Sequence, residues 1–306
     1  MTYFIHIPKW LCFIAIFGFL SCGNDDLGPD LKNGELPANI WSRDSKNAVI
    51  ASQTSDTVLI TNISDPTVVF DSGEFKLWAG CVSADNSYAF ICYSESVDGS
   101  NWSDLQIVFE PVTDPNAWDN QRTEVPTVTI DHAESDQSKK YKMWYGGSNK
   151  TAPDSTKIGL AYSADGITWE RLEANLSLGS KRGLVMEPGF SIGDAGVVSD
   201  PTAYIKDGTY HIWYNSFGSS NDILISHAVS TNGYDWDKDN NNPIMTPNLA
   251  WESEGPKDIT EDVSHPVVML EPATGKFLMW YGSFDNSENE TYSGLGFATS
   301  DDGSNW

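Results

Sequence analysis

The stretch that decides the fold is YKMWYGGSNKTAPDSTKIGLAYSADGITW, residues 141–169. It opens with an aromatic and apolar run in which alternate side chains point to opposite faces, so Tyr141 and Met143 share one face and Trp144 lies on the other. A second apolar run ends at Asp165-Gly166, and Asp-Gly supplies the positive φ angle that a tight turn needs. The stretch therefore predicts short strands that are covered on both faces and a tight turn.

The same unit recurs along the chain, and this repeat is the main signal in the sequence. Each copy opens near a proline with a short β-branched run, continues with an aromatic strand and closes at a tryptophan. The aromatic strands lie at 75–78, 141–145, 210–214 and 277–281. The closing tryptophans recur every 67 to 70 residues and are Trp102, Trp169, Trp236 and Trp306. Short strands at this period, with no amphipathic helical stretch between copies, are typical of the four-stranded blades of a β-propeller.

The two ends of the repeat indicate how the ring closes. Residues 237–244 follow the third closing tryptophan and are expected to form the outer strand of that blade. Residues 41–50 have the same outline but no opening strand of their own, so we infer that they supply the outer strand of a closing blade whose inner strands come from the C-terminal side. The prediction is an all-β, five-bladed β-propeller over residues 41–306 that is incomplete at its C-terminal end.

The first 22 residues are predicted to lie outside the fold. The apolar run from Trp10 to Leu20 is short for a transmembrane helix and has the length of a signal-peptide core. It leads into Cys22, and this ending resembles the lipobox of bacterial lipoproteins, in which the cysteine is lipidated; the acidic residues that follow resemble the export signal of surface lipoproteins. We therefore expect a lipoprotein signal peptide over 1–22, a flexible tether over 23–40 and an anchor in the outer membrane of a Gram-negative bacterium. An ordinary cleaved signal is the alternative.

Charge and cysteine content limit the partners. The chain has 18 basic and 43 acidic residues and a net charge of −25, which repels phosphate backbones and excludes nucleic acid as a partner. Cys81 and Cys92 flank a turn-like segment, and export would permit a disulfide between them, although two unpaired thiols fit equally well. No Cys/His cluster has zinc spacing, so neither a metal site nor a required cofactor is expected.

The pattern acid–Pro–Val, Tyr–x–Met–Trp–Tyr, Ala–x–Ser–x–Asp–Gly–x–x–Trp resembles the five-bladed propeller glycosidases over roughly residues 41–306. These include arabinanases and xylosidases of glycoside hydrolase family 43, invertase-like enzymes of family 32 and mannoside phosphorylases of family 130. The resemblance is specific for the fold and does not choose among the families. It implies a carbohydrate substrate and a site built from carboxylates.

Acidic residues near the opening prolines are the candidate catalytic groups. The first strand of each blade lines the funnel of a propeller, so acids just before its proline are expected to converge at one mouth. Glycoside hydrolysis requires such convergence, because one carboxyl group protonates the leaving oxygen and another activates water or attacks the anomeric carbon. A third carboxylate raises the pKa of the acid by repulsion. The candidates are Asp65, Glu124, Asp200 and Asp262.

The resemblance suggests roles for three of these acids. Asp65 matches the enzymes in residue type and position and is assigned as the base or nucleophile. Glu124 and Asp200 fit by position with their types exchanged, so we assign Glu124 as the acid and Asp200 as the modulator or a substrate ligand. Glu187 and Glu254, on loops before blade openings, are fallback acids. A repeated Asp-Pro can also cap a turn in every blade without any catalytic role.

Substrate binding is assigned to four further residues. Asp262 and His265 lie at the fourth opening; a histidine in the funnel could bind sugar or help to hold a central calcium ion through water, as in some related enzymes, and a structural histidine is the alternative. Trp118 and Trp251 lie on loops that lead into blades and are candidates for stacking on sugar rings. The favoured function is a glycoside hydrolase or phosphorylase that acts on polysaccharide or oligosaccharide at the cell surface. A non-catalytic sugar-binding propeller and a protein-interaction propeller are the alternatives.

Overall fold

The computed structural model describes residues 50–55, 58–85, 88–173, 178, 181–189, 196–217, 222–249, 252, 262–284 and 293–306. Within them, regular structure is almost entirely β-strand, with a short 3-10 helix at Gln137–Lys139. No described helix is long and apolar enough to cross a membrane. The predicted signal peptide, the tether and Cys22 lie outside the described residues.

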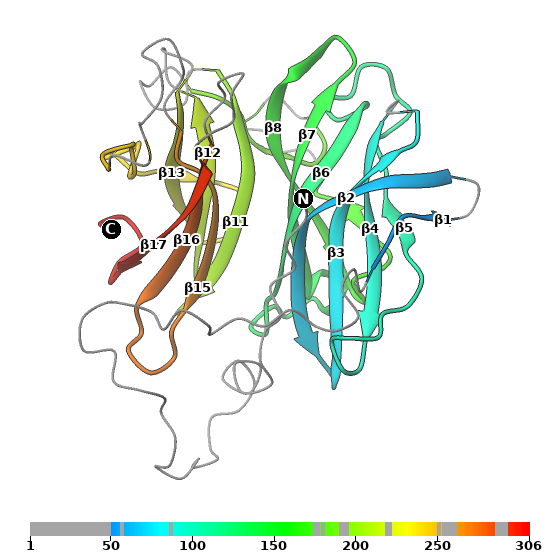
Figure 1. Ribbon diagram of the computed structural model, residues 1–306, viewed down its shortest axis with the longest axis horizontal. Helices are drawn as coiled ribbons and strands as arrows, with labels where there is room; N and C mark the ends of the chain where they lie inside the picture. Colours follow the sequence, from blue (N-terminus) through cyan, green and yellow to red (C-terminus); the bar gives the residue numbers. More distant parts are fainter. Residues whose placement is uncertain are drawn as a thin grey trace.

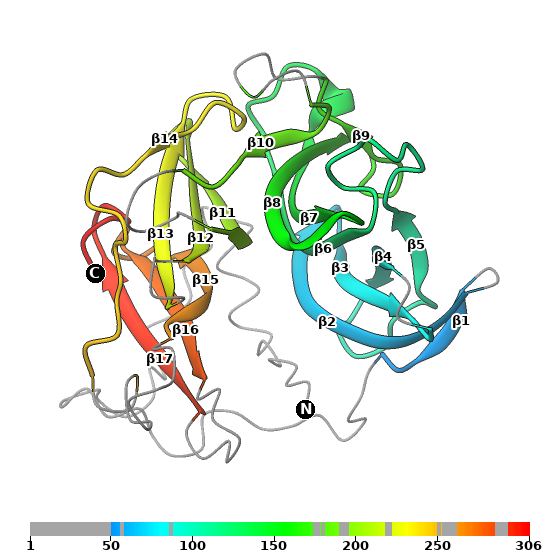
Figure 2. The same ribbon diagram turned by 90° about the horizontal axis from the view of Figure 1, so that it is seen from above.

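The described strands form four antiparallel meanders, which we call blades 1 to 4 (Figures 1 and 2). Blades 1 and 2 are joined into one sheet by a parallel pair between β4 and β6, at Ala89 and Arg122. Blade 1 contains β1 (Gln53–Ser55), β2 (Val58–Asp71), β3 (Glu74–Ser83), β4 (Ala89–Ser96) and β5 (Gln106–Phe109). Blade 2 contains β6 (Arg122–Ile130), β7 (Tyr141–Asn149), β8 (Ala152–Ser163), β9 (Glu170–Arg171) and β10 (Leu184–Met186). Blade 3 contains β11 (Val198–Lys206), β12 (Thr209–Phe217), β13 (Ile223–Ser230) and β14 (Asp237–Lys238), and blade 4 contains β15 (Ser264–Leu270), β16 (Phe277–Phe284) and β17 (Ser293–Ser300).

Seen from above, the blades follow one another around an arc (Figure 2). We call the strand that contains the opening proline the first strand of its blade, and these first strands are neighbours in the order β2, β6, β11, β15. Threonine hydroxyls join these first strands: Thr67 Oγ1 accepts a hydrogen bond of 3.4 Å from the backbone N–H of Val128, and Thr127 Oγ1 accepts one of 3.2 Å from that of Ala203. The expected repeat of strands and the inner position of each opening strand are therefore confirmed.

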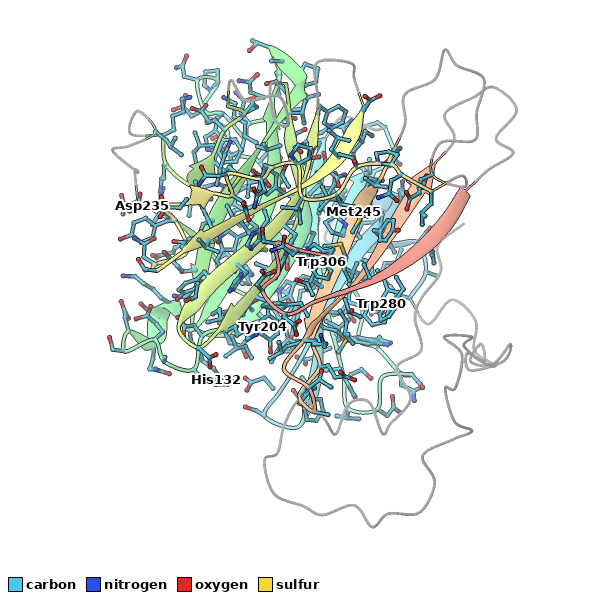
Figure 3. The ribbon with its side chains drawn as sticks, turned by 90° about the vertical axis from the view of Figure 1, so that its left-hand side faces the viewer. His132, Tyr204, Asp235, Met245, Trp280 and Trp306 are labelled. Carbon is cyan, nitrogen blue, oxygen red and sulfur yellow. The ribbon has the colours of Figure 1, made fainter. Side chains whose placement is uncertain are left out.

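The regular shape of the repeat comes from contacts between consecutive blades. The tryptophan of each of the first three middle strands donates its indole N–H to the turn glycine of the next blade. These bonds are Trp78 to Gly166 O at 2.7 Å, Trp144 to Gly233 O at 2.8 Å and Trp213 to Gly303 O at 2.7 Å. Tyr204, Met245 and Trp306, labelled in Figure 3, pack on the cluster around Trp213 between blades 3 and 4.

Blade 4 ends the row of described blades with an apolar surface. The residue paired with the middle-strand tryptophan is buried in blade 2, where Leu160 pairs with Trp144 and is 0% exposed. In blade 4 the same position is Phe297, which pairs with Trp280 and is 51% exposed. The closing blade expected from the sequence stays a prediction, because residues 41–49, assigned to its outer strand, lie outside the described residues.

Cys81 and Cys92 are free, buried thiols on the adjacent strands β3 and β4. The two cysteines are not directly opposite, because Cys81 pairs with Phe90 and Cys92 pairs with Ala79. Of the two sequence alternatives, the structure shows the unpaired thiols. The hydrogen bond to Cys81, followed by burial, raises the pKa of Cys92 far above its ordinary value.

Candidate functional site

All four first strands contain a β-bulge immediately before their proline. The pairing register shifts there in β2, β6, β11 and β15. The residue before each proline has a positive φ: 51° at Asp65, 49° at Val125, 49° at Asp200 and 52° at His265. Positive φ is uncommon outside glycine, and for a β-branched residue such as Val125 it is a true outlier. Strain held at four equivalent places on neighbouring inner strands marks this region as a candidate functional site.

The bulges place the four candidate acids at different levels of their blades. Asp65 and Asp200 are themselves the bulge residues. Glu124 lies one residue earlier and still pairs with Gly146 in the ladder. Asp262 precedes β15 and bridges to Ile223 of blade 3. The reason is that the bulge inserts an unpaired residue directly before the proline, so acids at different distances from the proline belong to different levels of the blade.

The acids nevertheless interact with one another. The side chain of Glu124 is 24% exposed. Burial raises the pKa of Glu124; the charge of Arg122 acts in the opposite direction, and the charges of Asp200 and Asp65 raise the pKa further. Arg122 Nη1 lies 3.4 Å from Glu124 Oε2. The charges of Asp65 and Asp200 therefore both act on Glu124, and with burial they shift its pKa in the direction that a proton donor needs.

Asp200 is held by donors from two strands. Its Oδ2 accepts hydrogen bonds from Ser199 Oγ at 2.6 Å and from Asn215 Nδ2 at 2.7 Å. Its Oδ1 lies 4.0 Å from Nε2 of His265, the bulge residue of blade 4. His265 Nδ1 is in turn 3.0 Å from Ser264 Oγ. Sequence reasoning missed Asn215 and Ser199, which become recognisable only when the blades are aligned on their registers.

Asp262 is the most buried acid of the region. It is 2% exposed, and its Oδ1 is buried without a hydrogen-bond partner. Burial raises its pKa to about 6, with a further contribution from the charge of Asp200, while a hydrogen bond to Ser264 and the charge of His265 oppose the shift. An unpaired buried acceptor is costly when the group is ionised, which accounts for the shift of its equilibrium toward the neutral acid.

Other predicted residues lie elsewhere. Trp118 is 5% exposed, stacks on Tyr145 with ring centroids 5.7 Å apart and donates to the Arg182 carbonyl at 2.9 Å. This corrects its assignment to sugar stacking, because the ring face is used in the core of blade 2.

The fallback acid Glu187 is bound by two lysines: its Oε1 lies 2.5 Å from Lys157 Nζ and 2.7 Å from Lys181 Nζ. Although burial acts in the opposite direction, these lysines lower its pKa, which does not suit a proton donor. Glu254 and Trp251 lie outside the described residues.

Metal ligation and cavities do not add to the site. Among the described residues, no group of three or more His, Cys, Asp or Glu side chains is placed to hold a metal ion. A cavity of about 230 Å³ lies at the outer strand of blade 3, lined by His227 and residues 237–240 among others. It is separate from the bulges of the inner strands.

The meanders around one arc, with their first strands side by side, define a β-propeller fold. No protein-family model matches the chain, and no curated protein sequence matches it. Solved structures do match. They include a complex of BT0996 with RGII, at 16% identity and a TM-score of 0.63, covering 84% of this chain and 74% of that one. A family 117 glycoside hydrolase of Zobellia galactanivorans, Zg3597, matches at 14% identity and a TM-score of 0.58, covering 84% and 71%.

A third match shows the same fold with another chemistry. An N-acetylgalactosamine deacetylase from F. plautii, in complex with blood group B trisaccharide, matches at 14% identity and a TM-score of 0.62, covering 85% of this chain and 77% of that one. A β-1,2-mannobiose phosphorylase and a family 32 β-fructofuranosidase also match, which are two of the groups expected from the repeat. At these identities the likeness shows the fold alone, and the expected all-β propeller class is confirmed.

Proposed function

We propose that this chain is a glycoside hydrolase that acts on oligosaccharide or polysaccharide, with Asp65 as base or nucleophile, Glu124 as acid and Asp200 as the modulator of Glu124. The proposal is carried by the position of Glu124 on the inner strand β6, where its side chain is 24% exposed and burial, then the charges of Asp200 and Asp65, raise its pKa against the charge of Arg122. A general acid must hold its proton at the working pH, and partial burial beside like charges shifts the pKa of a carboxyl group in that direction. The matching glycosidase structures support carbohydrate as the substrate class.

The three acids would divide the reaction as follows. Glu124 donates its proton to the glycosidic oxygen as the bond to the anomeric carbon breaks. The Asp65 carboxylate either activates a water molecule or attacks that carbon. Asp200 accepts hydrogen bonds from Ser199 and Asn215, and its charge adds to burial in raising the pKa of Glu124.

The test is sugar release from arabinan, xylan, fructan, mannan and aryl glycosides by the secreted protein and by Asp65→Asn and Glu124→Gln variants. We expect each variant to lose activity by about 10²–10⁴-fold, the usual contribution of a catalytic acid or base. Asp207→Asn is the matched control, since Asp207 also has a positive φ of 52° but lies exposed in the β11–β12 turn. Full activity in the Asp65 and Glu124 variants would contradict the assignment.

A non-catalytic sugar-binding propeller is the second candidate. One observation favours it: Val125 is apolar at the bulge position where blades 1 and 3 carry Asp65 and Asp200. Under this alternative, the panel shows no sugar release, while the folded protein binds one of the same polysaccharides in a pull-down.

We also propose that Cys22 carries a lipid that anchors the protein at the cell surface; the resemblance of its surroundings to a lipobox supports this. In cells fed a labelled fatty acid, the parent protein should become labelled and sediment with membranes. A Cys22→Ser variant should remain unlabelled. Equal labelling of the two proteins would contradict the proposal.

A further inference from the structure

Asn215 occupies a position that is glycine in the other three blades. In each described blade, the residue two positions before the proline pairs with the residue two positions after the middle-strand tryptophan. These pairs are Ser64 with Gly80, Glu124 with Gly146, Ser199 with Asn215 and Ser264 with Gly282. Blade 3 is therefore the one described blade with a side chain at this level.

In blades 1 and 3, a side chain at this position points at the bulge of the following blade. A Cβ built on Gly80 would lie 3.5 Å from the backbone nitrogen of Val125, the bulge residue of blade 2. In blade 3 the Asn215 amide uses the same direction: its Oδ1 accepts a hydrogen bond of 2.9 Å from the backbone N–H of His265, the bulge residue of blade 4. The other end of the amide, Nδ2, donates to Asp200 Oδ2 at 2.7 Å.

This amide joins two strained residues across a blade boundary. Asn215 is 2% exposed, so neither hydrogen bond has ready competition from water. Together with Ser199, it supplies two donors to Asp200 Oδ2, and rotation of that carboxylate would break both bonds. Asp200 Oδ1 is thereby held toward His265.

We propose that Asn215 is a positioning residue that holds Asp200 and His265 in a fixed relation at the candidate active site. This inference rests on the proposed function for its catalytic meaning, but its structural core does not depend on activity. The link to chemistry runs through Asp200, whose charge acts on Glu124. If the amide is removed, Asp200 can turn away from Glu124, the repulsion weakens, and Glu124 should release its proton at lower pH.

The experiment uses Asn215→Gly, with Asn215→Ala as a second variant. Glycine is the residue of the other blades, so the fold should be retained. Side-chain carboxyl NMR titration of Glu124 reports on the positioning without any substrate. We expect the Glu124 pKa to fall by about half a unit or more, an ordinary size for the loss of a nearby charge. Asn240→Gly, on an exposed turn, is the matched control and should leave the titration unchanged.

Activity gives the second readout. We expect kcat of Asn215→Gly to fall by about 10–100-fold, as misplaced catalytic groups do, with the alkaline limb of its pH profile moved to lower pH. If the parent has no hydrolase activity, the proposed function fails, while the titration still decides on the positioning role. An unchanged Glu124 titration in both folded variants would overturn the inference.

Discussion

The indole nitrogen of Trp144 donates a hydrogen bond of 2.8 Å to the carbonyl oxygen of Gly233, 89 positions further along the chain. The donor belongs to the middle strand of blade 2, and the acceptor belongs to the turn that closes blade 3. The ring of Trp144 also packs edge-on against Trp236, the closing tryptophan of blade 3, with centroids 6.1 Å apart. In blades 1 to 3, the tryptophan of the middle strand therefore fixes the distance to the next blade.

Replacement of Trp144 by phenylalanine should lower the free energy of unfolding by about 2–4 kcal/mol. It leaves the buried Gly233 carbonyl without its donor and opens a cavity beside it. Urea unfolding followed by fluorescence would measure the loss. Trp102→Phe is the control, because Trp102 is partly exposed and its N–H bonds within its own turn to Gly99 O. A similar small loss for both variants would contradict this role of the inter-blade bond.

The turn glycines should differ in their tolerance of alanine. Gly166 and Gly208 have φ values of +83° and +79°, so alanine is strained at both. A Cβ on Gly166 would lie 2.7 Å from Cζ2 of Trp78, whereas nothing lies within 4 Å at Gly208. We expect Gly166→Ala to be more destabilising than Gly208→Ala by about 1–3 kcal/mol, the cost of overpacking a core. Thermal unfolding of the pair measures the difference, and equal losses would show that φ alone matters.

The buried acid Asp262 predicts a pH dependence of stability. Its pKa is raised from 3.8 to about 6 in the folded state, so the folded protein retains this proton after the unfolded chain has released it. Its contribution is therefore fully present below pH 3.8 and is lost as pH rises through about 6. Asp262→Asn cannot lose a proton. Relative to the parent, it should gain up to about 3 kcal/mol of stability as pH rises from 4 to 7.

Urea denaturation at several pH values would measure this gain, with Asp207→Asn as the exposed control. A difference between Asp262→Asn and the parent that stays constant with pH would contradict the raised pKa of Asp262.

The two free thiols should be inert in the native state. Cys81 and Cys92 are both 0% exposed, and the pKa of Cys92 is raised, so little reactive thiolate is present. In a background with Cys12→Ser and Cys22→Ser, we expect a water-soluble thiol reagent to label neither cysteine until denaturant is added, when both react. Failure to label them after denaturation without reductant would instead reveal a disulfide.

Much of the fold was predictable because each blade repeats the same local chemistry. The aromatic alternation at Tyr141–Tyr145 and the turn at Asp165-Gly166 depend on near neighbours, so strands and turns follow from the sequence pattern. The prediction for Trp118 was wrong because a tryptophan on a loop gives no sign of whether its face is covered. Tyr145, which covers it, is 27 positions away in the chain and reaches it only in the folded blade.

The repeated blade, its inner opening strand and the presence of acids near the opening prolines follow from residue types at short spacing. The levels at which those acids lie follow from the folded blades. The bulges place Val125 and His265, rather than Glu124 and Asp262, at the level of Asp65 and Asp200. The bridge from Asp200 through Asn215 to His265 joins residues up to 65 positions apart. Such contacts arise from the packing of one blade on the next, which the period of the repeat does not encode.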